Sequence, residues 1–112
     1  GDGYPDGQAA ITFRRSAPGQ PHGVYLFTDA NYAGNYCFVE KGKYVDFDNN
    51  AKFMPFNDKI SSAWLYGVEY CVLYEDYGFS GKTLFLNDET PYVGHEMNDK
   101  TSGVAVDTIP WL

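Results

Sequence analysis

The sequence predicts an all-β protein that folds as a two-sheet Greek-key sandwich, and three observations lead to this. Aromatic residues make up 18% of the 112 residues and glycine occurs 12 times, a composition that suits pleated strands and tight turns. Short runs of β-forming residues alternate with turn signals along the chain. No stretch carries the apolar stripe of an amphipathic helix. At this length we expect one domain with a substantial core.

Six runs are the clearest strand candidates. They are VYLF, NYCFVE and SSAWLYG in the first half of the chain, then YCVLYE, TLFLN and GVAVDTI in the second. The turn-forming segments DANYAG, EKGK, YGFSG and NDETP separate them. With a weaker third strand in each half, the total is about eight antiparallel strands, and Greek-key connections commonly join such strands.

The two halves repeat one another, which defines the domain organisation. The repeated residues keep a spacing of 47 positions and are Phe27 with Tyr74, Tyr32 with Phe79, and Gly34 with Gly81. We therefore divide the domain, residues 23–112, into a first motif over 23–68 and a second over 69–107. Residues 1–22 are rich in Gly and Pro and are expected to form an N-terminal extension, in which AAITFRR provides an edge strand or a docked arm.

The charge of the chain excludes several classes of function. The formal net charge is −7, with 15 acidic against 8 basic residues, and Arg14–Arg15 is the one adjacent basic pair. A nucleic-acid interface is therefore not expected, because it requires clustered Lys and Arg. No apolar run approaches the length of a membrane span, and no signal peptide is expected in the first residues, which lack a basic start and an apolar stretch.

The two cysteines, Cys37 and Cys71, leave two interpretations open. Both lie in alternating apolar segments, which favours two buried thiols. One disulfide is the alternative, and we expect it if the chain is exported. A zinc site is not expected, because His22 and His95 are the two histidines and no paired-ligand spacing occurs.

A specific resemblance rests on a motif that occurs twice, an aromatic residue followed by four residues, a second aromatic, one residue and Gly. The two copies are FTDANYAG, residues 27–34, and YEDYGFSG, residues 74–81. The pattern is similar to the signature of the βγ-crystallin Greek-key motif, in which the Gly allows a folded-over hairpin. The resemblance covers residues 23 to about 107 and implies a sandwich of the βγ-crystallin type.

A second repeated motif resembles the calcium loop of microbial members of this family, N/D-N/D-x-x-S/T-S. Residues 57–62, NDKISS, fit it at every position. Residues 98–103, NDKTSG, depart from it at Gly103, which casts doubt on the geometry of the second loop more than on its ligands. The fifth-position serines, Ser61 and Ser102, are also expected to tie the hairpin down through their hydroxyl groups, whether or not metal is bound.

The resemblance implies two Ca²⁺ ions, each shared between the two motifs. Ca²⁺ takes six to eight oxygen ligands, and these loops offer carboxylate, carbonyl and hydroxyl oxygens. The implied ligands are Asp58, Lys59 (carbonyl) and Ser61 from the first loop, Asp99, Lys100 (carbonyl) and Ser102 from the second, and Thr28 and Glu75, which follow the first aromatic of each motif. The assignment of each ligand to one ion is left open.

A rival calcium motif is rejected. Asp46, Asp48 and Asn50 imitate the start of an EF-hand loop, but Ala51 replaces the required Gly and Asn57 replaces the bidentate Glu. The paired carboxylates Asp88–Glu89 and Glu75–Asp76 do not imply catalysis, because nothing supplies a nucleophile, a base and an oxyanion hole together.

The first functional hypothesis is thus a non-enzymatic calcium-binding module with a structural, stress-related or extracellular binding role. We expect it to be a monomer at an extracellular or cell-surface location. The alternatives on the same fold are a secreted metalloproteinase inhibitor, whose partner would be a protease, and a killer-toxin-like protein. The inhibitor hypothesis depends on disulfides, which those proteins require.

Overall fold

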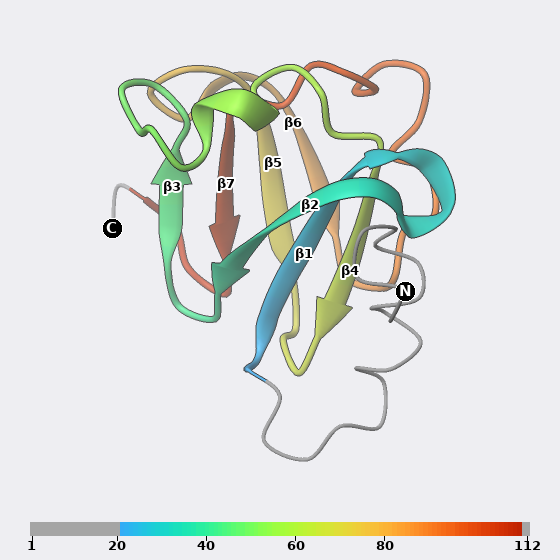
Figure 1. Cartoon of the computed structure of the whole chain (residues 1–112). Coiled ribbons are helices and arrows are strands. Elements are labelled where there is room, and N and C mark those ends of the chain that lie inside the picture. The colour runs from blue at the N-terminus through green and yellow to red at the C-terminus, as the bar shows by residue number, and fades with distance from the viewer. Residues whose placement is uncertain (1–20, 111–112) are drawn as a thin grey trace.

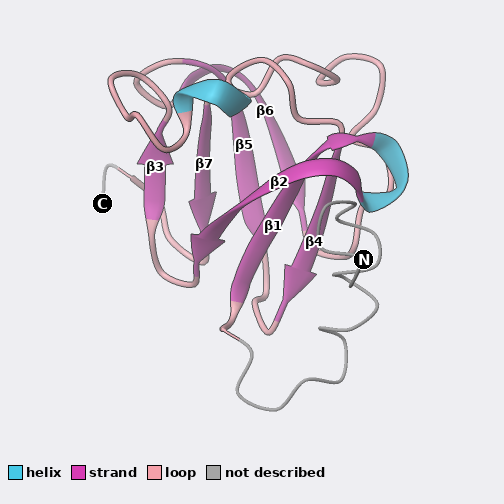
Figure 2. Ribbon diagram, viewed as in Figure 1, coloured by secondary structure: helices cyan, strands magenta, loops and turns pink. Residues whose placement is uncertain are grey.

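The predicted all-β sandwich is confirmed in a computed structural model that describes residues 21–110. Two antiparallel sheets pack face to face, and two short 3₁₀ segments interrupt the loops (Figure 1; Figure 2). The proposed N-terminal extension falls mainly on residues 1–20, outside the described part of the chain. The elements are β1 Gly23–Asp29, η1 Ala30–Tyr32, β2 Ala33–Glu40, β3 Tyr44–Asp46, η2 Met54–Phe56, β4 Ser62–Tyr66, β5 Cys71–Asp76, β6 Ser80–Leu86 and β7 Gly103–Val106.

The two motifs exchange their third strands. One sheet has the order β2-β1-β4 and the other β3-β7-β5-β6, so β3 of the first motif joins the sheet of the second. The reciprocal strand, the predicted eighth, is a single bridge in which Thr90 and Ala63 exchange backbone hydrogen bonds of 2.8 and 2.9 Å. Pro91 follows at once, and since its ring fixes φ and removes the N–H donor, the pairing stops there.

The folded-over hairpins have matching geometry in both motifs. The β1–β2 register shifts between Phe27 and Asp29, and the β5–β6 register shifts between Tyr74 and Asp76. The residue within each shift, Thr28 or Glu75, is left out of the ladder, as in a β-bulge. Gly34 and Gly81 follow with φ of 83° and 77°, where a Cβ would also collide with the side chain of Thr28 or Asp76. The repeated glycine is therefore required in each hairpin.

The core lies between the sheets, and the alternation of strand residues fills it. Leu65, Val104 and Val106, from the strands that follow the loops, are buried there. Trp64 is also buried, at 5% exposure, but it points to the opposite face of its sheet and packs with Tyr25 and Phe27. The sandwich thus has a main core and a smaller aromatic cluster on the outer face of β1 and β4.

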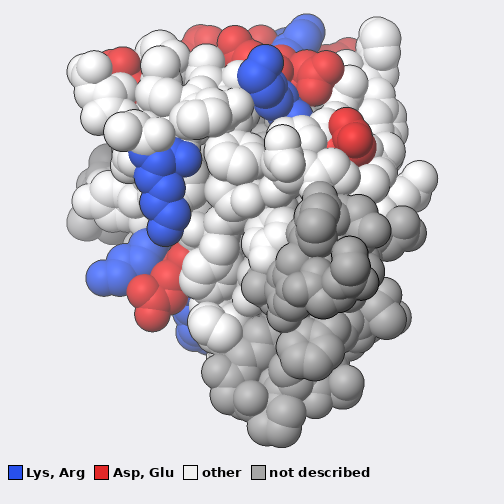
Figure 3. Space-filling view, viewed as in Figure 1, with Lys and Arg blue, Asp and Glu red and all other residues white. Residues whose placement is uncertain are grey.

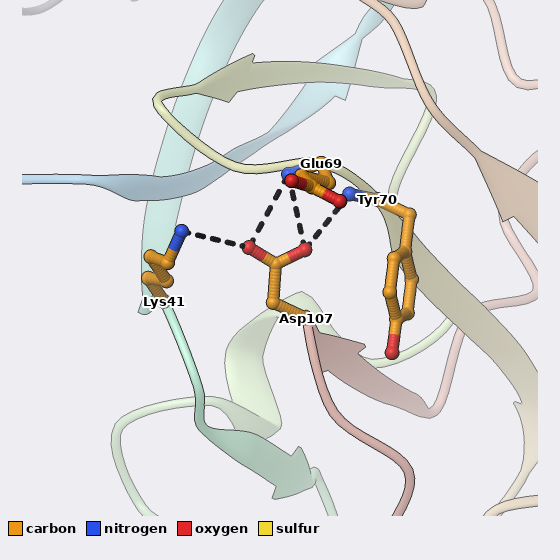
Figure 4. Close-up of polar contacts among 4 residues, drawn as sticks. All are labelled: Lys41, Glu69, Tyr70 and Asp107. Atoms are coloured by element: carbon orange, nitrogen blue, oxygen red, sulfur yellow. Dashed lines mark hydrogen bonds and ion pairs between the residues drawn. The ribbon is translucent and has the colours of Figure 1, made fainter.

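The Asp107 carboxylate stabilises the end of the sandwich at which β2 and β7 end and β5 begins. Asp107 accepts hydrogen bonds from the backbone N–H groups of Glu69 (3.0 Å) and Tyr70 (2.9 Å), and Lys41 Nζ lies 3.3 Å from it (Figure 4). Its backbone has a φ of 52°, a left-handed conformation that Asp adopts more readily than most residues. Asp107 therefore joins the turn between β4 and β5 to the turn after β2.

Of the two interpretations of the cysteines, the structure shows the first, because Cys37 and Cys71 are free, buried thiols. They lie on β2 and β5, which belong to different sheets, and both are buried in the core. Burial raises the pKa of each thiol to about 12. Both thiols are therefore protonated and inert at neutral pH, since the thiolate is the reactive form.

We expect the folded protein to resist alkylation at pH 8 and to label at two cysteines in denaturant, as measured by intact mass. Unfolded thiols ionise near pH 8.5. The unfolded chain therefore loses protons that the folded protein keeps, and the free energy of unfolding should fall between about pH 8.5 and 12. The fall should be smaller when both cysteines are replaced by alanine. Labelling of the folded protein at the unfolded rate would contradict this burial.

Candidate functional site

The two Asn-Asp-Lys loops, residues 57–61 and 98–102, lie side by side at the end of the sandwich opposite Asp107 (Figure 1). Each loop turns at its Asp, since Asp58 and Asp99 have left-handed φ values of 58° and 61°. The Asp58 N–H donates to the Thr101 carbonyl at 2.9 Å, and the Asp99 N–H donates to the Ile60 carbonyl at 3.1 Å. Each loop is therefore held by the backbone of the other motif.

The side chains of the loops are also paired crosswise. The Ser102 hydroxyl donates to Asp58 Oδ1 at 3.3 Å, and the Ser61 hydroxyl donates to Asp99 Oδ1 at 3.5 Å. Within its own motif, each serine donates its backbone N–H at 2.8 Å to the carbonyl of the first aromatic, Phe27 for Ser61 and Tyr74 for Ser102. The side chain of each Asp therefore contacts the serine of the other motif, and this contact lies beside the bulge of the motif that provides the serine.

The remaining predicted residues, Thr28 and Glu75, lie in the bulges and directly follow the aromatic residues whose carbonyls accept the serine N–H groups. Thr28 Oγ1 accepts the N–H of Asn35 at 3.1 Å, and Glu75 Oε1 accepts the N–H of Lys82 at 3.2 Å. We call Asp99, Ser61 and Thr28 the β1-side group, and Asp58, Ser102 and Glu75 the β5-side group.

Lys59 and Lys100 lie at the third position of each loop, and both side chains are exposed. Their N–H groups donate back to Phe56 (3.1 Å) and Met97 (3.0 Å), which closes the turn before each loop. No backbone N–H of the described residues donates to the carbonyl of either lysine. The two carbonyl groups therefore keep lone pairs for another partner.

A surface cleft of about 610 Å³ opens beside the β5-side group, and acidic residues dominate its lining: Asn57, Asp58, Glu75, Asp76, Tyr77, Asp99, Lys100 and Ser102. Figure 3 shows acidic side chains gathered along this upper rim of the molecule. The ion pairs found among residues 21–110, Lys41 with Asp107 and Lys82 with Glu96, leave the carboxylates of the cleft unpaired. Their mutual repulsion would be relieved by a cation.

The oxygen atoms at this edge suit a hard cation. Asn57 Oδ1 and Asn98 Oδ1, from the first positions of the loops, and Thr101 Oγ1 are buried without a hydrogen-bond partner. Such orphaned oxygens are costly unless water or an ion contacts them. Within residues 21–110, no three His, Cys, Asp or Glu side chains converge closely enough to hold a metal alone. A bound cation would also need carbonyl, hydroxyl and water oxygens, the mixed set that Ca²⁺ accepts.

The expectation that the fifth-position serine ties the hairpin is wrong, because Ser62 at the sixth position does so. Its hydroxyl donates to the Asp29 carbonyl at 2.6 Å and accepts the N–H of Tyr32 at 3.0 Å. Ser61 has no such contact and turns to Asp99 instead. The sixth-position Ser of the loop motif was the signal that could have identified this residue.

Gly103 replaces this serine in the second motif, and Asp46 compensates. Asp46 lies opposite Gly103 in the β3–β7 ladder, and its Oδ2 accepts the N–H of Gly78 at 2.8 Å in the second hairpin. Asp46 Oδ1 also accepts the N–H of Asp48 at 3.2 Å. Through these contacts Asp46 holds a backbone N–H of the second hairpin and one of its own turn.

The fold and this site define a two-motif Greek-key sandwich with exchanged third strands and paired loops. The sequence matches no protein-family model and no curated protein. Among solved structures, it is similar to a βγ-crystallin domain from Clostridium beijerinckii, with 26% identity over 75% of this chain and 95% of that chain and a TM-score of 0.66. A βγ-crystallin domain from Flavobacterium johnsoniae gives 24% identity, 80% and 97% coverage and a TM-score of 0.66.

Two further likenesses concern the same fold. The N-terminal domain of Protein S has 20% identity, 79% and 98% coverage and a TM-score of 0.68. A clostrillin double mutant in complex with nickel has 24% identity, 77% and 98% coverage and a TM-score of 0.68. Together with the repeated motifs, these likenesses show that the chain has the βγ-crystallin type of fold. Residues 21–110 contain no helix that is long and apolar enough to cross a membrane.

We predict different effects for the two adjacent serines in metal-free protein. Ser62→Ala should lower the free energy of unfolding by about 1–3 kcal/mol, because the Tyr32 N–H loses its acceptor. Ser61→Ala should cost less than about 1 kcal/mol, since its 3.5 Å contact is long for a hydrogen bond. Urea denaturation in a calcium chelator measures both values. If Ser61→Ala lowered the free energy of unfolding more than Ser62→Ala does, the fifth-position serine would be the one that stabilises the hairpin, which would contradict this assignment.

Proposed function

We propose that this domain is a non-enzymatic module that binds two Ca²⁺ ions, one at the β1-side group and one at the β5-side group. The observation that carries the proposal is the crosswise pairing of Asp58 with Ser102 and of Asp99 with Ser61. Each proposed site combines a carboxylate, a hydroxyl and nearby backbone carbonyls, which is the oxygen chemistry that Ca²⁺ prefers.

The residues have distinct roles in this proposal. Asp58 and Asp99 supply the charged oxygens, Ser61 and Ser102 supply hydroxyl oxygens, and Lys59 and Lys100 supply carbonyl groups. Thr28 and Glu75 complete the two groups from the bulges. When bound, Ca²⁺ would neutralise the clustered carboxylates and link residues from both motifs.

The proposed biological role is structural or stress-related, or extracellular binding, and the proposed location is extracellular or at the cell surface. Calcium affinities in the range of about 10⁻⁴ to 10⁻³ M are typical of extracellular modules, where the ion is abundant. The protease-inhibitor alternative loses its support, because the two cysteines are free. No observation favours the killer-toxin alternative, and we propose a monomer.

Calcium should stabilise the folded protein, because the ion binds the folded state and not the unfolded chain. At one hundred times Kd the gain is about 2.7 kcal/mol. Mg²⁺ should give much less, since it prefers a near-ideal octahedron and loses water reluctantly. Calorimetric titration of metal-stripped protein and thermal melts with each ion measure both effects.

Two substitutions locate the ions. Asp58→Asn and Asp99→Asn keep the side-chain shape, and each should strongly weaken one of the two binding events and weaken the other less. Asp48→Asn, which changes an exposed Asp outside the cleft, serves as the control with equal charge change. If millimolar Ca²⁺ leaves the melting temperature of the unsubstituted protein unchanged, the repeated loop is a turn and the proposed function is wrong.

A further inference from the structure

The two groups differ at one of their equivalent positions. Thr28 and Glu75 both lie in a bulge, 47 positions apart, and both accept the N–H of the residue seven positions later. The two side chains therefore stabilise their hairpins through equivalent hydrogen bonds. They differ as ligands, because Glu75 carries a full negative charge and a second carboxylate oxygen, whereas Thr28 has one neutral oxygen.

The charge of Glu75 is available to the cleft. The nearby Lys82 places its Nζ 3.1 Å from Glu96 Oε1 and attracts Glu75 less strongly than it attracts Glu96, and no Lys, Arg or His among residues 21–110 forms an ion pair with Glu75. Glu75 lines the acidic cleft together with Asp58 and Ser102. Asp99 of the β1-side group also lines this cleft, whereas Thr28 and Ser61 are absent from its lining.

We propose that the two calcium sites are unequal and that Glu75 sets the difference. The β5-side group binds Ca²⁺ first and more tightly, and the β1-side group, with Thr28 in the equivalent place, binds second. This inference rests on the proposed calcium binding. Its physical basis is that affinity for Ca²⁺ rises with the number of charged ligands in a site of given geometry, and one additional carboxylate acts at close range.

Paired substitutions test the proposal. Glu75→Gln keeps an oxygen that can accept the Lys82 N–H and removes the charge. It should weaken the tighter calorimetric step by about tenfold and leave the weaker step within about twofold. Thr28→Glu should strengthen the weaker step by a similar factor. Glu40→Gln is the matched control, because Glu40 is exposed at the end of β2, away from the cleft, and it should change neither step.

A second readout assigns the order of binding without relying on affinities. In a titration followed by amide NMR shifts, the signals of Asp58, Glu75 and Ser102 should move at lower Ca²⁺ than those of Asp99, Thr28 and Ser61. Glu75→Gln should reduce or reverse this separation.

The outcomes separate this inference from the proposed function. If Ca²⁺ produces neither heat nor changes in amide shifts in the unsubstituted protein, both the proposed calcium binding and this inference are wrong. Two binding events in the reverse order, or equal weakening of both steps by Glu75→Gln, would overturn the inequality alone and leave calcium binding in place.

Discussion

The fold and the candidate site both depend on the crossing of the two Asn-Asp-Lys loops. Asp58 and Asp99 donate their backbone N–H groups to carbonyls of the other motif, and their side chains meet serines of the other motif. The exchange of third strands, in which β3 pairs with β7 and Thr90 with Ala63, continues the same interdependence into the sheets. Within this structure, neither motif satisfies its loop or completes its sheet with its own residues.

This crossing concentrates negative charge where the loops meet. Residues 69–107 hold eight acidic residues against Lys82 and Lys100, so the second motif carries −6 of the formal charge of −7. Four carboxylates line one cleft, and neither of the ion pairs found among residues 21–110 includes them. Asp107, at the other end of the sandwich, is by contrast fully used by two N–H groups and by Lys41. Asp107 therefore has a structural role, whereas the carboxylates of the cleft are available to a ligand.

Much of the fold could be predicted from local pattern, because the constraints are local. The spacing of 47 positions between Phe27 and Tyr74 identified both hairpins, and the bulges and the left-handed Gly34 and Gly81 follow from the same repeat. The loops were located in the same way. These features need no knowledge of long-range contacts.

Other features could not be predicted, since they depend on which segments meet in space. The spacing of Cys37 and Cys71 does not reveal that they lie on different sheets with free thiols. The pairing of Asp58 with Ser102 requires the crossing of the loops. The family pattern favours Ser61, at the fifth position, as the residue that ties the hairpin, but in the structure the Ser62 hydroxyl donates to the Asp29 carbonyl. Compensation for Gly103 by Asp46 arises only when β3 joins the other sheet.

The crossing is tested most directly by double-mutant cycles in the free energy of calcium binding. If each site draws on both motifs, Asp58→Asn and Ser102→Ala should be coupled by about 0.5–3 kcal/mol, whereas Asp58→Asn and Ser61→Ala should be additive within about 0.5 kcal/mol. Coupling of Asp58 to Ser61 in its own loop, with additivity between Asp58 and Ser102, would contradict the crossed arrangement.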